Sequence, residues 1–259
     1  MGLRPFKLDL HVHSVLSPCG ELEMGLSDIA RQAAEVGLDG LALTDHNACA
    51  NAAGLIEAAQ ELGLWVIPGC EVQTEEDIHV VCLFPTLGSA MDFQGWTWNL
   101  LNPVANDPDV FGYQLVVDKE GNILDQVDTL LVQGIRAGVD QVLLEVRQRG
   151  GITILSHVDR PSFSYPAVLG PIPPDLPVDA IEISWRASDQ EAERIRRSLP
   201  HLPFLRSSDS HCLSHLSAQR CTTFLMGDLS FPELRLALKG QEGRGILAPY
   251  RFPSDLEVR

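Results

Sequence analysis

The sequence predicts an α/β fold on a largely parallel sheet, arranged either as a barrel or as a doubly wound sheet. Short β-branched or leucine-rich runs alternate with amphipathic helical patterns along most of the chain. Several of these runs end in ionisable side chains, and contributions from many strands to one edge favour a barrel. The 259 residues are 45% hydrophobic, so the chain can bury one substantial core, and we expect a single domain over residues 1–259.

Seven runs have the composition and length of strands. They are Lys7–His13, Gly40–Thr44, Leu64–Cys70, Ile78–Phe84, Ile152–Ser156, Ala180–Ser184 and Phe204–Ser207. The amphipathic segments expected to be helices are Leu26–Val36, Asn51–Leu62, Ile123–Gly134, Val139–Arg149, Asp189–Leu199 and Phe231–Leu238.

Two stretches fit this alternation poorly. Leu87–Asp118 holds two tryptophans and two prolines, and we expect a long insertion between the fourth and fifth strands that forms a lid or wall. Ser162–Pro177 contains five prolines and is expected to be a largely extended or turned loop.

The charge balance restricts the partners. Thirty-five acidic residues against nineteen Lys and Arg give a formal charge of −16, which repels a polyanion unless positive charge is concentrated locally or metal ions supply it. We therefore expect no stable nucleic-acid partner.

The six cysteines form no CxxC pair and are expected to be reduced thiols. The first residues lack the apolar stretch of a signal peptide, and no run approaches the ~18 apolar residues of a membrane span. These features predict a soluble, cytoplasmic protein with no membrane partner.

The first expected strand carries the clearest metal-binding pattern. The two-residue period of a strand places Asp9, His11 and His13 on one face, so the two imidazoles can converge on one ion. An HxH pair on a strand also occurs for packing or hydrogen bonding, so the pair alone does not decide between the two.

Further ionisable runs follow the other strands. They are Thr44–Asp45–His46, Gly69–Cys70–Glu71, Ser156–His157 and Ser208–Asp209–Ser210–His211, and His79 begins another strand. His201 and His215 lie outside these runs and are interpreted as solvated or core histidines. Imidazoles and carboxylates with few thiols suit zinc, manganese or iron rather than a four-cysteine zinc site. More than six such ligands exceed one ion, so two or three divalent ions with bridging ligands are expected.

Taken in order, these motifs resemble the PHP (polymerase and histidinol phosphatase) superfamily. The resemblance covers roughly residues 7–212 and implies a distorted (β/α)7 barrel of TIM-barrel type, with the metal site at the carboxyl ends of the strands. It also implies a trinuclear site. One ion would take His11, His13, Glu71 and Asp209; a second would share Glu71 and add His79 and His157; a third would take His46 and His211.

The third ion also needs a ligand from the loop after the first strand, where the family usually offers Asp, Glu or His. The loop here reads Ser–Pro–Cys–Gly–Glu over residues 17–21. Cys19 is the preferred ligand, because a divalent ion lowers the pKa of a thiol sharply. Glu21 is the alternative, and a loop that donates nothing is a third possibility.

Two residues are expected to act beside the ions. Asp45 either bonds a ligating imidazole or a metal-bound water, or caps a helix. Arg160, three residues after His157, is the best-placed arginine to bind a phosphate oxygen through its guanidinium group, and Arg186 and Arg206 come next. Each of the three is also readily explained as a surface or ion-pair residue.

The expected function is a metal-dependent phosphoesterase that hydrolyses a small phosphomonoester or a nucleotide with a metal-activated water. The alternatives are exonuclease-like action on short oligonucleotide ends, hydrolysis of a C–N bond as in amidohydrolases, and a non-catalytic metal-binding regulatory module. The length leaves no room for a polymerase, and the sequence does not specify the substrate, the metal or the oligomeric state.

Overall fold

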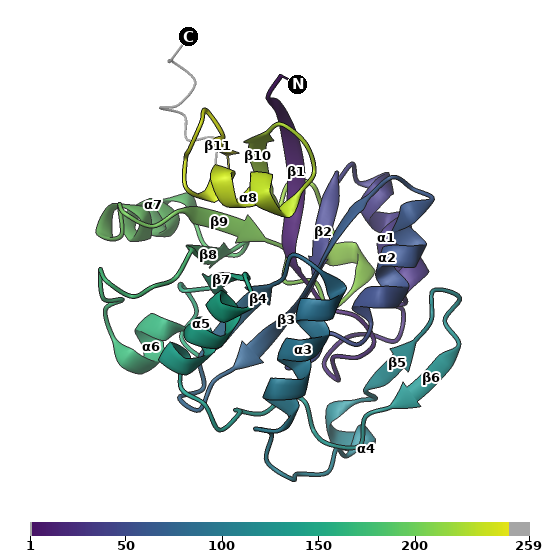
Figure 1. The fold of residues 1–259 in the computed structure, drawn as a ribbon. Helices are drawn as coiled ribbons and strands as arrows, with labels where there is room; N and C mark the ends of the chain where they lie inside the picture. The colour runs from purple at the N-terminus through teal and green to yellow at the C-terminus, as the bar shows by residue number, and fades with distance from the viewer. Residues whose placement is uncertain (1, 249–259) are drawn as a thin grey trace.

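The computed structural model describes residues 2–248, and Figure 1 shows the arrangement of its elements. The strands are β1 Arg4–Val12, β2 Gly40–Leu43, β3 Trp65–Gln73, β4 His79–Leu83, β5 Leu115–Val117, β6 Ile123–Gln126, β7 Ile152–Leu155, β8 Ala180–Ser184, β9 Phe204–Ser207, β10 Thr222–Met226 and β11 Gly245–Ala248. The helices are α1 Leu26–Glu35, α2 Ala52–Gln60, α3 Leu87–Trp98, α4 Pro108–Phe111, α5 Val139–Gln148, α6 Tyr165–Leu169, α7 Asp189–Ser198 and α8 Phe231–Leu238, with a 3-10 turn η1 at Leu213–His215.

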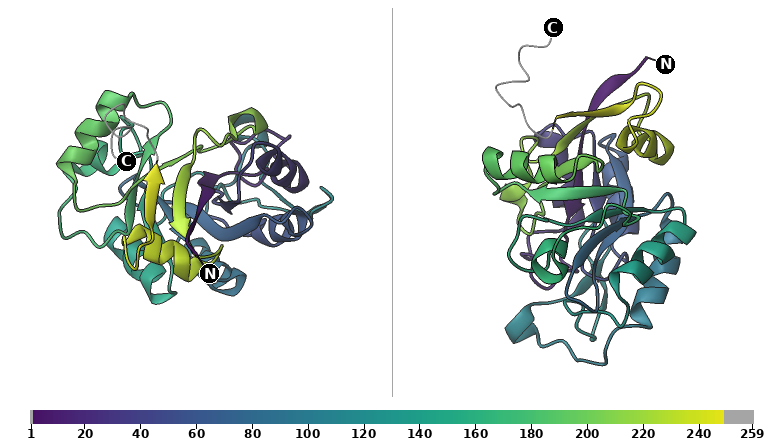
Figure 2. Two further views of the ribbon diagram at one scale, coloured as in Figure 1. Left: turned by 90° about the horizontal axis from the view of Figure 1, so that it is seen from above. Right: turned by 90° about the vertical axis from the view of Figure 1, so that its left-hand side faces the viewer.

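All seven expected strands are confirmed, and they lie side by side in chain order. The main sheet has nine strands in the order β11-β10-β1-β2-β3-β4-β7-β8-β9. In the view of Figure 1, helices α1 and α2 lie to the right of this curled sheet, beside β2, and α6 and α7 lie to its left. Figure 2 shows the same arrangement from two further directions. The fold is a mixed α/β structure.

The sheet is not the expected parallel sheet throughout. Strand β4 pairs antiparallel with both β3 and β7, whereas β1–β2, β2–β3, β7–β8 and β8–β9 pair in parallel. The cause is local: only a tight turn over residues 74–78 joins β3 to β4, with Asp77 at φ 63° and a hydrogen bond from the Thr74 amide to the Ile78 carbonyl. A parallel return needs a crossover of a dozen or more residues, so this turn forces β4 to run back.

The expected distorted (β/α)7 barrel is confirmed only in part, as a curled mixed α/β sheet. Between β9 and β1 a single parallel bridge joins Val12 and Ser210, and the strand order within residues 2–248 contains no β9–β1 pairing. Strands β10 and β11, which were not expected, extend the sheet from β1 by antiparallel pairing. The result is a curled half-barrel.

One expected helix is wrong. Ile123–Gly134 contains strand β6, which pairs with β5 as a separate hairpin, followed by a loop. The turn between β5 and β6 favours the hairpin: the carboxylate of Asp118 accepts a hydrogen bond from the amide of Asn122, and Gly121 has φ 86°. Ile123 therefore lies 64% exposed on the hairpin instead of on the buried face of a helix.

The two irregular stretches also contain helices. Leu87–Asp118 begins with α3, which Thr86 starts by a capping box with Ser89, and only its second part is irregular. Phe93 of α3 is fully buried in the core. In Ser162–Pro177 the short helix α6 begins at Tyr165, and turns and extended backbone make up the rest.

Strand β1 shows how the core supports the polar site. Leu8 and Leu10 pack in one apolar cluster and Val12 in a second, and the pairing of β1 with β2 shifts register between Asp9 and Val12. His11 and His13, two residues apart, both face the carboxylate of Glu71. Both faces of the strand are buried. All six cysteines are free thiols, and no helix among residues 2–248 is long and apolar enough to cross a membrane.

Candidate metal centre

The carboxylate of Glu71 lies at the centre of a ring of imidazoles. Glu71 stands on β3 and is 1% exposed. Its two oxygens lie 3.3 Å from Nε2 of His11, 3.6 Å from Nε2 of His13, 3.3 Å from Nδ1 of His46, 3.1 Å from Nδ1 of His79 and 3.4 Å from Nε2 of His157. Because imidazoles face both oxygens, this carboxylate is placed to bridge two ions.

These side chains converge because their strands meet at one edge. His46, His157 and Asp209 follow the carboxyl ends of the parallel strands β2, β7 and β9. His79 begins β4, and the antiparallel direction of that strand brings its first residue to the same edge. The short turn that breaks the parallel pattern therefore places a candidate ligand correctly.

Backbone conformation at the centre is unusual. His157 and Asp209 have φ of 30° and 49°, in a region that residues other than glycine rarely adopt. Such conformations persist where surrounding structure holds them, and they are common at functional sites. Here they turn two side chains back over the ends of their strands.

The candidate ligand atoms form three overlapping groups, each with its atoms within 4.8 Å of one another. The groups are His11, His13, Glu71 and Asp209; His46, Glu71 and His79; and His13, His46 and His211. The first group is the set expected for the first ion. The second contains His46 as well as the expected His79. His157 is outside this group, but its Nε2 lies 3.4 Å from Oε1 of Glu71, the oxygen that His79 also faces.

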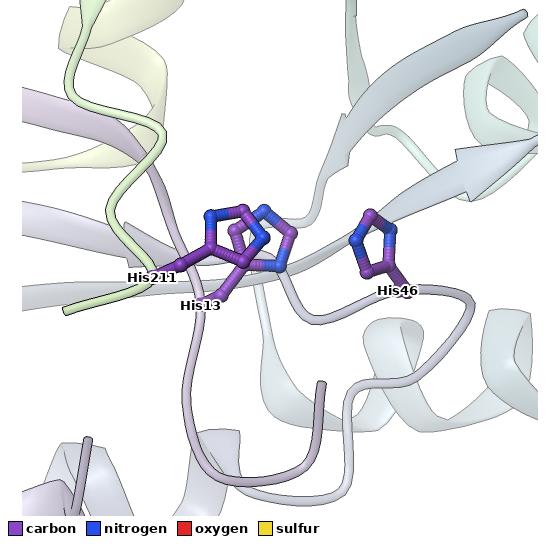
Figure 3. A group of neighbouring side chains, drawn as sticks. All are labelled: His13, His46 and His211. Carbon is purple, nitrogen blue, oxygen red and sulfur yellow. The ribbon is translucent and has the colours of Figure 1, made fainter. Parts of the chain in front are cut away.

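Figure 3 shows the third group, in which His13 and His211 lie close together and His46 lies across from them. The rings of His13 and His211 are stacked with centroids 4.1 Å apart, and those of His13 and His46 are 4.6 Å apart. Sequence reasoning expected His46 and His211 together, and the structure adds His13.

Several buried polar atoms of this cluster lack a hydrogen-bond partner. They are Nδ1 of His46, both ring nitrogens of His79, Nδ1 of His157 and Oε1 of Glu71. Three of these atoms, Nδ1 of His46, Nδ1 of His79 and Oε1 of Glu71, lie at the centre itself. Buried polar atoms are nearly always satisfied in proteins, so orphans that converge in this way indicate a ligand site. Imidazole nitrogens around a shared carboxylate are the donor set that zinc, manganese or iron takes, and these residues fit divalent ions.

Glu182 orients His11, and sequence reasoning missed it. Glu182 stands on β8 and is 1% exposed, and its carboxylate oxygens lie 3.1 and 3.2 Å from Nδ1 of His11. A carboxylate accepts, so Nδ1 carries the hydrogen and the Nε2 lone pair faces the centre. The signal in the sequence is a glutamate in the middle of the buried strand AIEIS.

Ser17 orients the ring of His13, as Glu182 orients that of His11. Its hydroxyl donates to Asp45 Oδ1 at 2.7 Å, so the contact of 3.0 Å with Nδ1 of His13 requires the imidazole to donate. Asp45 also accepts from the amide and hydroxyl of Ser14, both at 2.7 Å. Asp45 thus holds the loop after β1 and reaches His13 through one hydroxyl.

Asp9 links two backbone segments that carry candidate ligands. Its Oδ1 accepts from the amides of Ser208 at 3.0 Å and His11 at 3.4 Å, which ties β1 to the segment carrying Asp209. Burial raises the pKa of Asp9 to about 6.

The pKa values of the ionisable groups in this cluster are shifted in different directions by burial and by neighbouring charges. Burial opposes ionisation of Glu71, but the charges of His79 and His11 hold the pKa of Glu71 well below its usual value. Burial, together with the charge of His211, lowers the pKa of His13 to about 3, and burial with the charge of His13 lowers that of His46 as well. Burial alone would lower the pKa of His11, yet Glu71, Glu182 and Asp209 hold it well above its usual value.

Cys19 is not brought into any of the three groups. The residue is exposed, and the ring of ligand atoms around Glu71 does not include its sulfur. Glu21 is exposed too, and its amide donates to the carbonyl of His211 at 2.9 Å. From this loop the side chain that reaches the imidazoles is Ser17.

Arg160 borders the centre. Its Nη2 lies 2.6 Å from Oδ2 of Asp209, and its side chain is 33% exposed. Burial works against its charge, but Asp209 raises the pKa of Arg160 overall. The guanidinium thus lies between a candidate ligand and solvent.

The fold and the site define an α/β half-barrel with a histidine-rich candidate metal centre around one glutamate. The PHP domain model matches residues 9–159, more than half of the chain. The chain belongs to the PHP domain family.

The chain is also similar to several known proteins. The uncharacterized protein YqxK of Bacillus subtilis is 25% identical over 173 residues, which are 67% of this chain and 39% of YqxK. Endonuclease Q from Pyrococcus furiosus has a TM-score of 0.66 and 19% identity over 95% of this chain and 60% of its own. A two-domain protein from Bacteroides vulgatus, containing a predicted PHP-like metal-dependent phosphoesterase, has a TM-score of 0.55 and 16% identity over 93% of this chain and 64% of its own. At such identities the likeness to solved structures shows the fold alone, and the chain spans less than two thirds of each of these proteins.

Proposed function

We propose that this protein is a metal-dependent hydrolase that cleaves a phosphate ester of a small phosphomonoester or nucleotide. The observation that carries the proposal is the ring of five imidazoles within 3.6 Å of the Glu71 carboxylate. Two or three divalent ions, zinc, manganese or iron, suit this number of ligands. Bound there, the ions would activate water and neutralise phosphate oxygens.

Side chains around the ions would supply negative charge, orient the ligating rings and bind the phosphate. Glu71 and Asp209 supply negative charge at the centre of the ligand set, while Glu182 and Ser17 fix the ring orientations of His11 and His13. Arg160 is positioned to hold a phosphate oxygen, because its planar guanidinium is already directed at the edge of the centre and remains part-exposed.

The test is reconstitution followed by a substrate screen. Protein stripped with a chelator receives Mn²⁺, Zn²⁺ or Fe²⁺ separately and is then assayed on nucleotides, sugar phosphates and short 5′-phosphorylated oligonucleotides. We expect phosphate release from small monoesters that depends on the added ion and is absent in Glu71→Gln. The matched control, Glu57→Gln on the exposed face of α2, should behave as wild type.

Three outcomes would replace the proposal. Phosphate release only from oligonucleotides would indicate an exonuclease-like activity, and turnover of an amide or lactone without phosphate release would indicate C–N or related chemistry. Stoichiometric metal binding without turnover of any substrate would indicate a metal-binding regulatory module.

A further inference from the structure

Two arginines are held over one tryptophan at the end of β8. Trp185 directly follows β8, and the guanidinium carbon of Arg220 lies 3.7 Å from the centre of its ring. The guanidinium carbon of Arg186 lies 5.2 Å from the same centre. A tryptophan face attracts guanidinium groups and restricts their orientation. The ring therefore brings two cations together that would otherwise repel each other.

Within residues 2–248, neither Arg186 nor Arg220 forms an ion pair with a carboxylate. Arg220 donates instead to the backbone carbonyl of His215 at 3.2 Å. The sequence holds thirty-five acidic residues and only nineteen Lys and Arg, so partners are plentiful elsewhere. Two cations with no ion-pair partner in the described part of such an acidic chain form a local positive patch suited to an anion.

The patch adjoins the metal centre. Glu182, three residues before Trp185, contacts His11, and His215 follows His211 by four residues on the other side. The rings of Trp185 and His215 lie 5.9 Å apart. Burial and the charges of Arg220, Arg186 and His211 lower the pKa of His215, and the opposing charge of Glu21 only partly offsets them, so the surroundings of His215 are positive on balance.

A third guanidinium approaches from β9. Nη2 of Arg206 donates to the carbonyl of Ala187 at 3.0 Å, just after Arg186 in the chain. From the sequence, Arg186 and Arg206 are candidates, after Arg160, to bind a phosphate oxygen, and His215 is interpreted as a solvated or core histidine. In the structure Arg186 follows the carboxyl end of β8 and His215 lies in η1 after β9, whereas Arg206 stands within β9 and contacts the backbone beside Arg186.

We propose that Arg186 and Arg220, fixed by Trp185, form a subsite for a second phosphate of the substrate, separate from the phosphate that the metal centre cleaves. This inference rests on the proposed function. The second phosphate has two sources with the same chemistry: a second phosphate on a small molecule, or the neighbouring phosphodiester of a short oligonucleotide. A pair of planar guanidinium groups matches the oxygens of either.

The experiment compares three ligands that differ by one feature. They are adenosine 5′-monophosphate, adenosine 3′,5′-bisphosphate and a 5′-phosphorylated dinucleotide, each measured with Mn²⁺-loaded protein for turnover and, by calorimetry, for binding. We expect Arg186→Gln with Arg220→Gln to reduce kcat/KM and affinity about tenfold or more for the ligands with a second phosphate. The values for the monophosphate should stay within about twofold. Which of the two larger ligands loses more identifies the source of the second phosphate.

Controls separate the subsite from folding and from the proposed function. Arg4→Gln removes an exposed arginine that also lies over an aromatic ring, 4.5 Å from the centre of Phe6, and should change nothing. Trp185→Leu should reproduce the loss with both arginines present. An equal loss for all three ligands, or none, overturns the subsite. If no phosphate ester is turned over, the binding measurement still decides: a second phosphate that adds no affinity in wild type overturns it.

Discussion

Glu182 accepts a hydrogen bond from Nδ1 of His11 at 3.1 Å, although 171 positions separate the two residues in the chain. The contact joins β8 to β1 across the curled sheet. It fixes the ring so that the other nitrogen points at Glu71, 3.3 Å away. Carboxylates that hold a ligating imidazole in this way set its tautomer and its basicity.

Replacing Glu182 by Gln should therefore weaken metal binding without unfolding the protein. An amide can donate as well as accept, so the hydrogen on Nδ1 of His11 is no longer enforced. We expect metal affinity to fall about 10- to 100-fold, measured by competition with a chromophoric chelator. An affinity equal to that of the Glu57→Gln control would show that Glu182 does not orient His11.

The Ser17→Ala change should act on His13 in the same manner. It removes the acceptor of the imidazole hydrogen and leaves Asp45 with one hydrogen bond fewer. A buried group left unsatisfied costs about 1–3 kcal/mol, so we expect a lower free energy of unfolding together with weaker metal binding. Ser198→Ala, on the exposed end of α7, is the control. If denaturant unfolding and metal titration both match wild type, the Ser17 contact has no such role.

Glu71→Gln should be among the most damaging single changes. It keeps the shape of the side chain but removes the charge that would offset two cations, while five imidazoles remain around it. We expect loss of at least one ion per chain and a decrease in turnover of at least about 100-fold. Full occupancy with near-normal turnover would rule out bridging.

Cys19→Ser should leave the metal content unchanged, because three imidazoles already form the third group and the Cys19 residue lies exposed outside it. The measurement is metal analysis of the reconstituted variant, beside Glu21→Gln. Loss of one ion in Cys19→Ser alone would restore the thiol as the ligand that the sequence suggested.

The ligand-bearing strands could be predicted because two local signals coincide in them. Short β-branched runs mark buried strands, and ionisable residues at their ends mark one edge of a sheet. His11 and His13 show this best, since the strand period alone places both on one face.

Other features depend on neighbours that are distant in the sequence. Glu182 is notable only once β8 lies near β1, and Ser17 only once the loop folds over His13. The Ile123–Gly134 segment was misjudged because its apolar spacing fits a helix as well as a hairpin. The antiparallel direction of β4 could have been predicted from the sequence, because the seven residues between Cys70 and Ile78 are too few for a crossover connection.

The most direct test of the central claim is metal analysis combined with anomalous scattering from crystals of the reconstituted protein. We predict two to three divalent ions per chain, with anomalous peaks about 2.0–2.3 Å from imidazole nitrogens and from Glu71, as for zinc and similar ions. Fewer than one ion per chain after reconstitution, or peaks away from Glu71, would contradict it.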